Sequence, residues 1–297
     1  MTPFQFEKAV TQPLVLPGLV KNNCEAAVLR LDLVHPIIAG NKWYKLRFYL
    51  QEALALQKNR IITFGGAWSN HLLATAAACR QLGLRSAALV RGEKPENLSA
   101  TLQQAASLGM ELHFVSRQQY KEKIVPETIR TDSDYVINEG GAGEPGVRGA
   151  STILDSIDKK HYTHIICAAG TGTTLAGLIN AAAPACKVIG IPVLSDLASI
   201  EKVLRYFVTN PSVQWQLCAG YEWGGYAKHP AALLSFMKEF YQQSGVPTDI
   251  VYTAKLFYAC TKLVENNFFE KGSRLLIIHS GGLQGNRSLP ANTFCFG

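Results

Sequence analysis

Short apolar runs alternate with longer amphipathic segments along the chain, which predicts strands followed by helices. The predicted strands are apolar runs bounded by turn residues: Arg60–Phe64, Ser86–Val90, Glu111–Val115, Tyr135–Asn138, His164–Ala168, Lys187–Ile191, Val213–Cys218 and Arg274–His279. The predicted helices lie between them: Ser69–Leu82, Leu98–Leu108, Thr173–Ala183, Leu197–Val208, Pro230–Gln243 and Ala254–Lys271. This alternation is typical of right-handed βαβ units, so we predict an α/β protein with open, twisted, mostly parallel sheets covered by helices.

The glycine cluster Gly140–Gly149 interrupts the pattern midway along the chain. Eight predicted strands also exceed what one small domain usually contains. We therefore expect two α/β domains with a ligand between them, because ligands collect at the carboxyl ends of strands and at domain interfaces.

Composition and charge exclude several classes of protein. The net charge is +7, but the lysines and arginines are dispersed, which disfavours nucleic-acid binding and leaves a positive field suited to an anionic cofactor or a carboxylate substrate. Apolar runs are too short for a membrane span, and the N-terminus lacks the pattern of a signal peptide, so we expect a cytoplasmic protein. The seven cysteines are far apart, which predicts neither a metal site nor a disulfide framework.

The first candidate for chemistry is the turn Gly40-Asn41-Lys42, which precedes a helical segment. The positive end of the helix dipole and partial burial both disfavour the charged form of Lys42. An amine with a lowered pKa is what imine chemistry requires. A surface lysine in an ordinary turn is the alternative.

Two further loops between a strand and a helix are candidate anion sites. In Gly65–His71, Ser69 is a good helix N-cap, and its hydroxyl with nearby backbone N–H groups would suit a carboxylate. In Gly170–Thr174, glycines allow close approach of a phosphate to successive N–H groups and threonine hydroxyls. The second loop is neither a Walker A loop nor a GxGxxG fingerprint. Plain capping and a plain turn are the alternatives.

Two late segments place hydroxyl groups at the same edge of the predicted sheet. Asp249–Lys255 opens a helix, and His279–Gly282 ends the last strand. Either could be only a cap and a turn.

Taken together, the segments GNKWYKLRFYL, FGGAWSNH, AAGTGTTLAG, DIVYTAK and IIHSGG resemble, in this order, the 1-aminocyclopropane-1-carboxylate (ACC) deaminase and D-cysteine desulfhydrase family. That family consists of fold-type II enzymes dependent on pyridoxal 5′-phosphate (PLP), related in structure to the tryptophan synthase β subunit. The resemblance covers residues 42–282. It implies a larger PLP-binding domain of residues 1–45 plus 151–297, a smaller domain of residues 46–150, and a homodimer acting on a small amino acid.

The resemblance also implies a role for each matching residue. Lys42 corresponds to the lysine that carries PLP, and Asn70 to the residue that binds the phenolic oxygen of the cofactor. The remaining matches are grouped by role: Ser69, Asn70 and His71 for the substrate carboxylate, Gly170, Thr171, Gly172, Thr173 and Thr174 for the phosphate, Tyr252 and Tyr221 beside the substrate, and Thr253 and Ser280 for the pyridine nitrogen. The chain departs from the family pattern at Trp43-Tyr44, where Thr-Arg is usual, which leaves the substrate open.

Residue 253 bears on the reaction. The resemblance places a glutamate at this position in ACC deaminases, where it keeps the pyridine nitrogen protonated, whereas this chain has Thr253. A neutral hydroxyl makes the cofactor a weaker electron sink, which suits β-elimination. We therefore expect D-cysteine to be converted to pyruvate, sulfide and ammonia, with Lys42 as the base, and Ser69 and Tyr252 as further catalytic residues. ACC deamination to 2-oxobutyrate is the alternative. A catalytically inactive PLP-binding or ligand-sensing protein, or a nucleotide-binding α/β enzyme, are alternatives of other classes.

Overall fold

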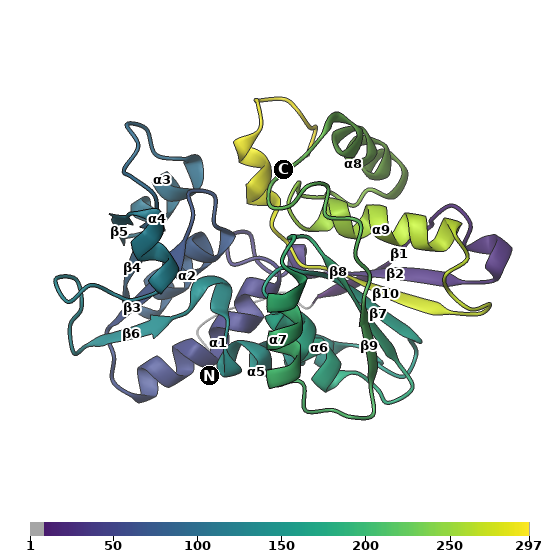
Figure 1. Ribbon diagram of the computed structural model, residues 1–297, viewed down its shortest axis with the longest axis horizontal. Helices are drawn as coiled ribbons and strands as arrows, with labels where there is room; N and C mark the ends of the chain where they lie inside the picture. Colours follow the sequence, from purple (N-terminus) through teal and green to yellow (C-terminus); the bar gives the residue numbers. More distant parts are fainter. Residues whose placement is uncertain (1–8, 297) are drawn as a thin grey trace.

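The computed structural model describes residues 9–296, and its strands form two separate sheets (Figure 1). The larger sheet has the order β1-β2-β10-β7-β8-β9 and the smaller one the order β5-β4-β3-β6. Every pair is parallel except β1 with β2. The strands are β1 (Val10–Pro13), β2 (Glu25–Arg30), β3 (Arg60–Gly65), β4 (Arg85–Arg91), β5 (Met110–Val115), β6 (Asp134–Ile137), β7 (His164–Ala169), β8 (Lys187–Pro192), β9 (Gln214–Leu217) and β10 (Arg274–His279).

Helices cover both sheets and fill the space between them (Figure 1). They are α1 (Asn41–Ala55), α2 (Asn70–Leu82), α3 (Ala100–Ser107), α4 (Arg117–Glu122), α5 (Glu144–Ser151), α6 (Thr173–Ala181), α7 (Leu197–Phe207), α8 (Ala231–Ser244) and α9 (Thr253–Glu265). None of the helices within residues 9–296 is long and apolar enough to cross a membrane.

The core of the larger sheet shows why its central strands are apolar throughout. Successive residues of β7 point to opposite faces: Ile166 packs under α8 and α9, whereas Ile165 packs against α5, α6 and α7. A parallel sheet that is covered on both faces has no polar side, so β7 is buried along its whole length.

The eight predicted strands are all present, and the predicted fold class is confirmed. Two strands were not predicted. β2 has the sequence EAAVLR, in which most residues are good helix formers, and the short edge strand β1 contains Pro13. Both adopt the strand conformation because they extend the larger sheet beyond β10, which is a tertiary effect.

The glycine cluster is not a break in the chain, because much of it forms α5. This helix packs against α1 and α6. A Cβ atom at Gly149 would collide with the Tyr44 carbonyl oxygen of α1, and one at Gly177 in α6 would lie 2.6 Å from the Ala150 Cβ. The glycines therefore allow close contacts between three helices. The smaller sheet lies within the predicted smaller domain, but the boundaries at residues 45 and 151 stay a prediction, and residues 1–8 and 297 lie outside the described part.

Candidate active site

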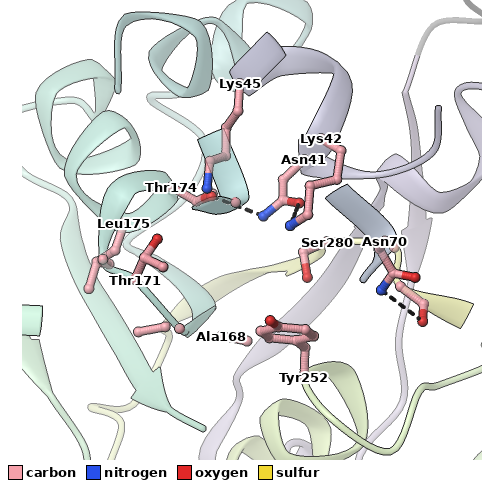
Figure 2. A pocket seen from close by; sticks show the side chains of 16 residues that line it. Asn41, Lys42, Lys45, Asn70, Ala168, Thr171, Thr174, Leu175, Tyr252 and Ser280 are labelled. Carbon is pink, nitrogen blue, oxygen red and sulfur yellow. Dashed lines mark hydrogen bonds between the residues drawn. The ribbon is translucent and has the colours of Figure 1, made fainter. Parts of the chain in front are cut away.

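A cavity lies where the carboxyl ends of strands from both sheets meet. The loop after β7 forms one wall, and the segment after β10 forms another. The first turn of α1 and Asn70 complete it (Figure 2). Two of the lining side chains are lysines, and no carboxylate lines this cavity in the described part of the chain.

Lys42 is held at the cavity by a close contact between two turns. Gly40 has φ +70°, and a Cβ atom there would collide with the Ser280 carbonyl oxygen. The same oxygen accepts a hydrogen bond of 3.1 Å from the Asn41 N–H. Glycine at position 40 therefore lets the start of α1 rest on the end of β10, which places Lys42 beside Ser280.

The Lys42 side chain is half-buried, and the hydrogen-bond partner of its amine is a neutral group. It donates to the Asn41 Oδ1 at 3.0 Å and lies 5.8 Å from the centroid of the Tyr252 ring. Burial lowers the pKa of Lys42 to about 8, against the opposing effect of the Asp249 carboxylate. A substantial fraction is consequently neutral near physiological pH, and a neutral amine can act as a nucleophile or a base.

Lys45 is a second lysine of the cavity, which sequence reasoning missed. It is only 3% exposed, and Figure 2 shows its side chain reaching toward Thr174. Burial, and then the charge of Lys42, hold its pKa well below the usual range. None of the ion pairs within residues 9–296 includes Lys45. A buried ammonium group without an anionic partner indicates that an anion binds there. The sequence feature that could have identified Lys45 is its position three residues after Lys42, which places both lysines on one face of the helix.

The loop Gly170–Thr174 forms a cup at the start of α6. Gly172 has the left-handed conformation at the helix N-cap, and a Cβ atom there would crowd Val203 and the Ile200 carbonyl oxygen. The N–H groups of Thr173 and Thr174 have no partner in the described structure. Thr171 and Thr174 line the cavity, whereas Thr173 is fully buried behind them. The Asn41 Nδ2 donates to the Thr174 Oγ1 at 2.9 Å and so ties the cup to the lysine turn.

The loop Gly65–His71 contributes Asn70 to the cavity wall, while Ser69 and His71 lie outside the wall. Asn70 Oδ1 is buried and has no partner within residues 9–296. Ser69 caps α2 by accepting a hydrogen bond of 3.4 Å from the Leu72 N–H. Within the described structure the N–H groups of Asn70 and His71, the first two of α2, have no partner and could therefore bind an anion.

The His71 imidazole is buried and bonds to another side chain of the protein interior. Because the Thr63 hydroxyl donates to the Ile137 carbonyl oxygen, it accepts from His71 Nε2 at 2.9 Å, which leaves Nδ1 unprotonated. Burial, with Lys42 and Lys45, holds the pKa of His71 well below its ordinary value. The side chain is therefore neutral.

Tyr252 and Ser280 line the cavity, but Thr253 does not. Thr253 is fully buried; its hydroxyl donates to the Asp249 Oδ1 at 2.7 Å and accepts from the Asp249 N–H at 2.7 Å. Of the two residues predicted for the pyridine nitrogen, the structure thus brings only Ser280 to the cavity. Burial raises the pKa of Tyr252 well above its usual value, so its phenol is protonated.

The structure places Tyr221 away from the cavity, with its ring 6.4 Å from the ring of Tyr258. Tyr226, in the same loop, is 49% exposed and does not line the cavity either. Trp43 is buried among apolar residues on the side of the smaller sheet, and neither it nor Tyr44 lines the cavity. The departure from the family pattern at Trp43-Tyr44 therefore makes no direct contact with a ligand there.

The fold and the cavity define an enzyme of the class that holds a phosphorylated cofactor between two α/β layers, beside a lysine with a lowered pKa. The family model described as pyridoxal-phosphate dependent enzyme matches residues 7–281. The chain belongs to this family, and its cofactor is PLP.

Similar proteins from other organisms are named as deaminases and desulfhydrases. A putative ACC deaminase of Thermotoga maritima is 30% identical over 96% of this chain and 94% of its own length. A mitochondrial protein of Arabidopsis thaliana, named bifunctional D-cysteine desulfhydrase/ACC deaminase, is 28% identical over 91% of this chain and 75% of its own length. The crystal structure of an ACC deaminase homologue superposes with a TM-score of 0.76 at 27% identity, over 94% of this chain and 91% of that one.

The residues present fit this cofactor. The buried ammonium of Lys45 and the open N–H groups of α6 together suit a phosphate. At the opposite wall, the orphaned amide oxygen of Asn70 indicates a missing polar partner.

Proposed function

We propose that this enzyme catalyses β-elimination from a small amino acid, with D-cysteine as substrate and pyruvate, sulfide and ammonia as products. The observation that carries the proposal is a cavity lined by lysines and neutral hydroxyl groups, with no carboxylate among its described lining residues. A pyridine nitrogen that faces the Ser280 hydroxyl gains no charge partner to hold a proton. A weaker electron sink suits a reaction in which the leaving group carries the electron pair away.

In this proposal different residues of the chain bind the cofactor, bind the substrate and transfer the proton. Lys42 binds the cofactor and, once released, takes the proton from Cα of the substrate, a role that its pKa of about 8 suits. Lys45 and the Gly170–Thr174 cup bind the phosphate, and Asn70 binds the phenolic oxygen. The open N–H groups at the start of α2, a helix that Ser69 caps, bind the carboxylate of the substrate. When bound, PLP supplies an electrophilic ring that stabilises negative charge at Cα.

Tyr252 is a candidate proton donor to the leaving group. Its phenol is protonated and lies next to Gly170 and the Lys42 amine. A substrate thiolate would have to leave from Cβ as S²⁻, so a phenol that keeps the sulfur protonated lets it leave as HS⁻.

ACC deamination to 2-oxobutyrate is the second candidate, supported by the names of several relatives at 27 to 30% identity. ACC has no hydrogen on Cα, so its reaction must begin at a ring carbon and needs a stronger electron sink. The absence of a lining carboxylate argues against it.

The test is a direct comparison of substrates on the purified holoenzyme. We expect kcat/KM for D-cysteine to exceed that for ACC, with pyruvate and sulfide released in equal amounts. Two controls accompany this comparison. L-cysteine tests the stereochemical preference of the enzyme, and the variant Lys42→Ala lacks the proposed base. Faster turnover of ACC with 2-oxobutyrate as product would overturn the proposal. An inert holoenzyme towards both substrates would support a ligand-sensing role instead.

A further inference from the structure

Lys255 is a third lysine with a lowered pKa, and it lies outside the cavity in the first turn of α9, three residues after Tyr252. Its side chain is fully buried. Its ammonium donates to three main-chain carbonyl oxygens: Gly225 at 2.6 Å, Glu222 at 2.8 Å and Val193 at 3.3 Å. An ammonium has three donors, so this set satisfies it completely.

The partners of Lys255 are those of a small monovalent cation. Proteins that bind K⁺ surround it with main-chain carbonyl oxygens, which replace the hydration shell of the ion. All hydrogen bonds of the Lys255 ammonium in the described structure go to such oxygens, and none goes to a carboxylate. Asp249 and Glu222 raise its pKa only through longer-range attraction, while burial lowers it to about 8.

Two of the three carbonyl groups, those of Glu222 and Gly225, come from a loop whose backbone is strained. Between β9 and α8, φ is positive at Trp223 (51°), Gly224 (84°), Gly225 (105°) and Ala227 (54°). Tryptophan and alanine rarely adopt this conformation, which persists only where surrounding contacts fix it. The Lys255 ammonium joins two carbonyl groups of this loop to α9 and, through Val193, to the end of β8, beside a ring contact of Trp223 with Tyr258 of α9.

The same loop carries Tyr226, which follows Gly225 directly. The phenol of Tyr226 interacts electrostatically with Tyr252 in the cavity wall and with Glu139 and Arg91 from the side of the smaller sheet. Tyr226 is 49% exposed and does not line the cavity, whereas Tyr252, three residues before Lys255, does line it.

We propose that the Lys255 ammonium takes the place of a bound monovalent cation and is a positioning residue, which holds the start of α9, and with it Tyr252 in the cavity wall, against the Glu222–Ala227 loop and the end of β8. The wild-type enzyme then needs no K⁺ or NH₄⁺. Removing the side chain leaves three carbonyl oxygens around a space, and either ion can occupy that space. The inference rests on the proposed function only where activity is measured.

The first experiment measures thermal unfolding of the holoenzyme in KCl, NH₄Cl and tetramethylammonium chloride at equal ionic strength. For Lys255→Ala we expect a higher midpoint in KCl and NH₄Cl than in the bulky salt, rising with ion concentration until it saturates. For the wild type and for Lys255→Met, whose side chain fills the space without charge, we expect the three midpoints to agree. Lys262→Ala, on the exposed face of the same helix, is the matched control.

The second experiment measures kcat/KM for D-cysteine in the same salts. We expect Lys255→Ala to lose about 100-fold in the bulky salt, the size of loss that follows when an active-site group is misplaced by about 1 Å. NH₄⁺ should restore at least a tenth of wild-type activity, at the concentration that saturates the shift in midpoint, and should not restore Lys255→Met. A lost side chain with a merely structural role would not show rescue by a specific ion.

Several results would overturn the proposal: equal midpoints for Lys255→Ala in all three salts, the same dependence in the wild type, or failure of Lys255→Ala to fold in any of them. If the proposed reaction is wrong, the wild type will not turn over D-cysteine, yet the salt dependence of unfolding will still appear in Lys255→Ala. The two failures are therefore distinguishable.

Discussion

Replacing Lys45 with methionine should change cofactor binding and protein stability in opposite directions. In the free protein the Lys45 ammonium is buried without an anionic partner, so it costs free energy. In the holoenzyme the proposed partner is the phosphate of PLP. The substitution Lys45→Met keeps the length and apolar stem of the side chain and removes only the charge.

The magnitude follows from the kind of contact that is lost. A hydrogen bond to a charged group contributes about 1.5–3 kcal/mol, so the Kd for PLP should rise about 10- to 150-fold. The free energy of unfolding of the apoprotein should increase by about 1–3 kcal/mol, since burial of residue 45 no longer requires an amine to lose its proton or its charge to be desolvated.

The assay is titration of the apoprotein with PLP and with pyridoxal, which lacks the phosphate, followed by absorbance. Only the Kd for PLP should rise in Lys45→Met, while that for pyridoxal stays the same. Unfolding of the apoprotein in urea gives the second quantity. Lys58→Met is the control, because Lys58 is a half-buried lysine shortly after the end of α1, outside the cavity, and its ammonium donates to the Asp132 carbonyl oxygen.

Equal losses for PLP and pyridoxal would refute this reasoning, because they would show that Lys45 does not contact the phosphate. A less stable apoprotein would refute the claim that the ammonium is unpaired.

Three further predictions test the geometry of the site. Gly40→Ala and Gly83→Ala are a matched pair, since φ is +70° and +69°, but only at Gly40 does a Cβ atom meet the Ser280 carbonyl; Gly83→Ala should cost about 1–2 kcal/mol in urea unfolding and Gly40→Ala at least twice that, and equal costs would contradict the close contact. Burial depresses the pKa of Lys42 to about 8, so the neutral amine gains as pH rises through 8, and the rate of PLP incorporation into apoprotein should rise and then level off; a rate still climbing near the ordinary lysine pKa of about 10.4 would show that burial has little effect. Thr253→Val should lower the free energy of unfolding by about 1–3 kcal/mol, because it removes the hydroxyl bonded to Asp249, and should leave the ratio of D-cysteine to ACC turnover unchanged; a shifted ratio would return Thr253 to the cofactor.

The fold was largely predictable from the sequence because its central strands are continuous apolar runs between helical patterns. The exceptions were segments whose conformation depends on distant partners. β2 has a helix-forming composition and becomes a strand beside β10, and the glycines of α5 reflect contacts with α1 and α6, not a flexible joint.

Part of the candidate site was also predictable from the sequence, and part of it depends on contacts that only the structure shows. The resemblance to the family assigned Lys42, Asn70, Tyr252 and the Gly170–Thr174 cup to one site, and the structure brings residues of all four to the cavity. Sequence alone could not show that the Thr253 hydroxyl turns inward to Asp249, since neighbouring residues at a helix start point in different directions. Lys45 and Lys255 read as ordinary helix lysines, and only their burial distinguishes them.

The attachment of PLP to Lys42 is the central claim, and the most direct measurement is to reduce the holoenzyme with borohydride and map the modified peptide by mass spectrometry. The account predicts one phosphopyridoxyl group per chain, on Lys42, and none in Lys42→Ala. A label on Lys45 or Lys255, the other two lysines with lowered pKa in the described chain, or no label after incubation with PLP, would contradict it.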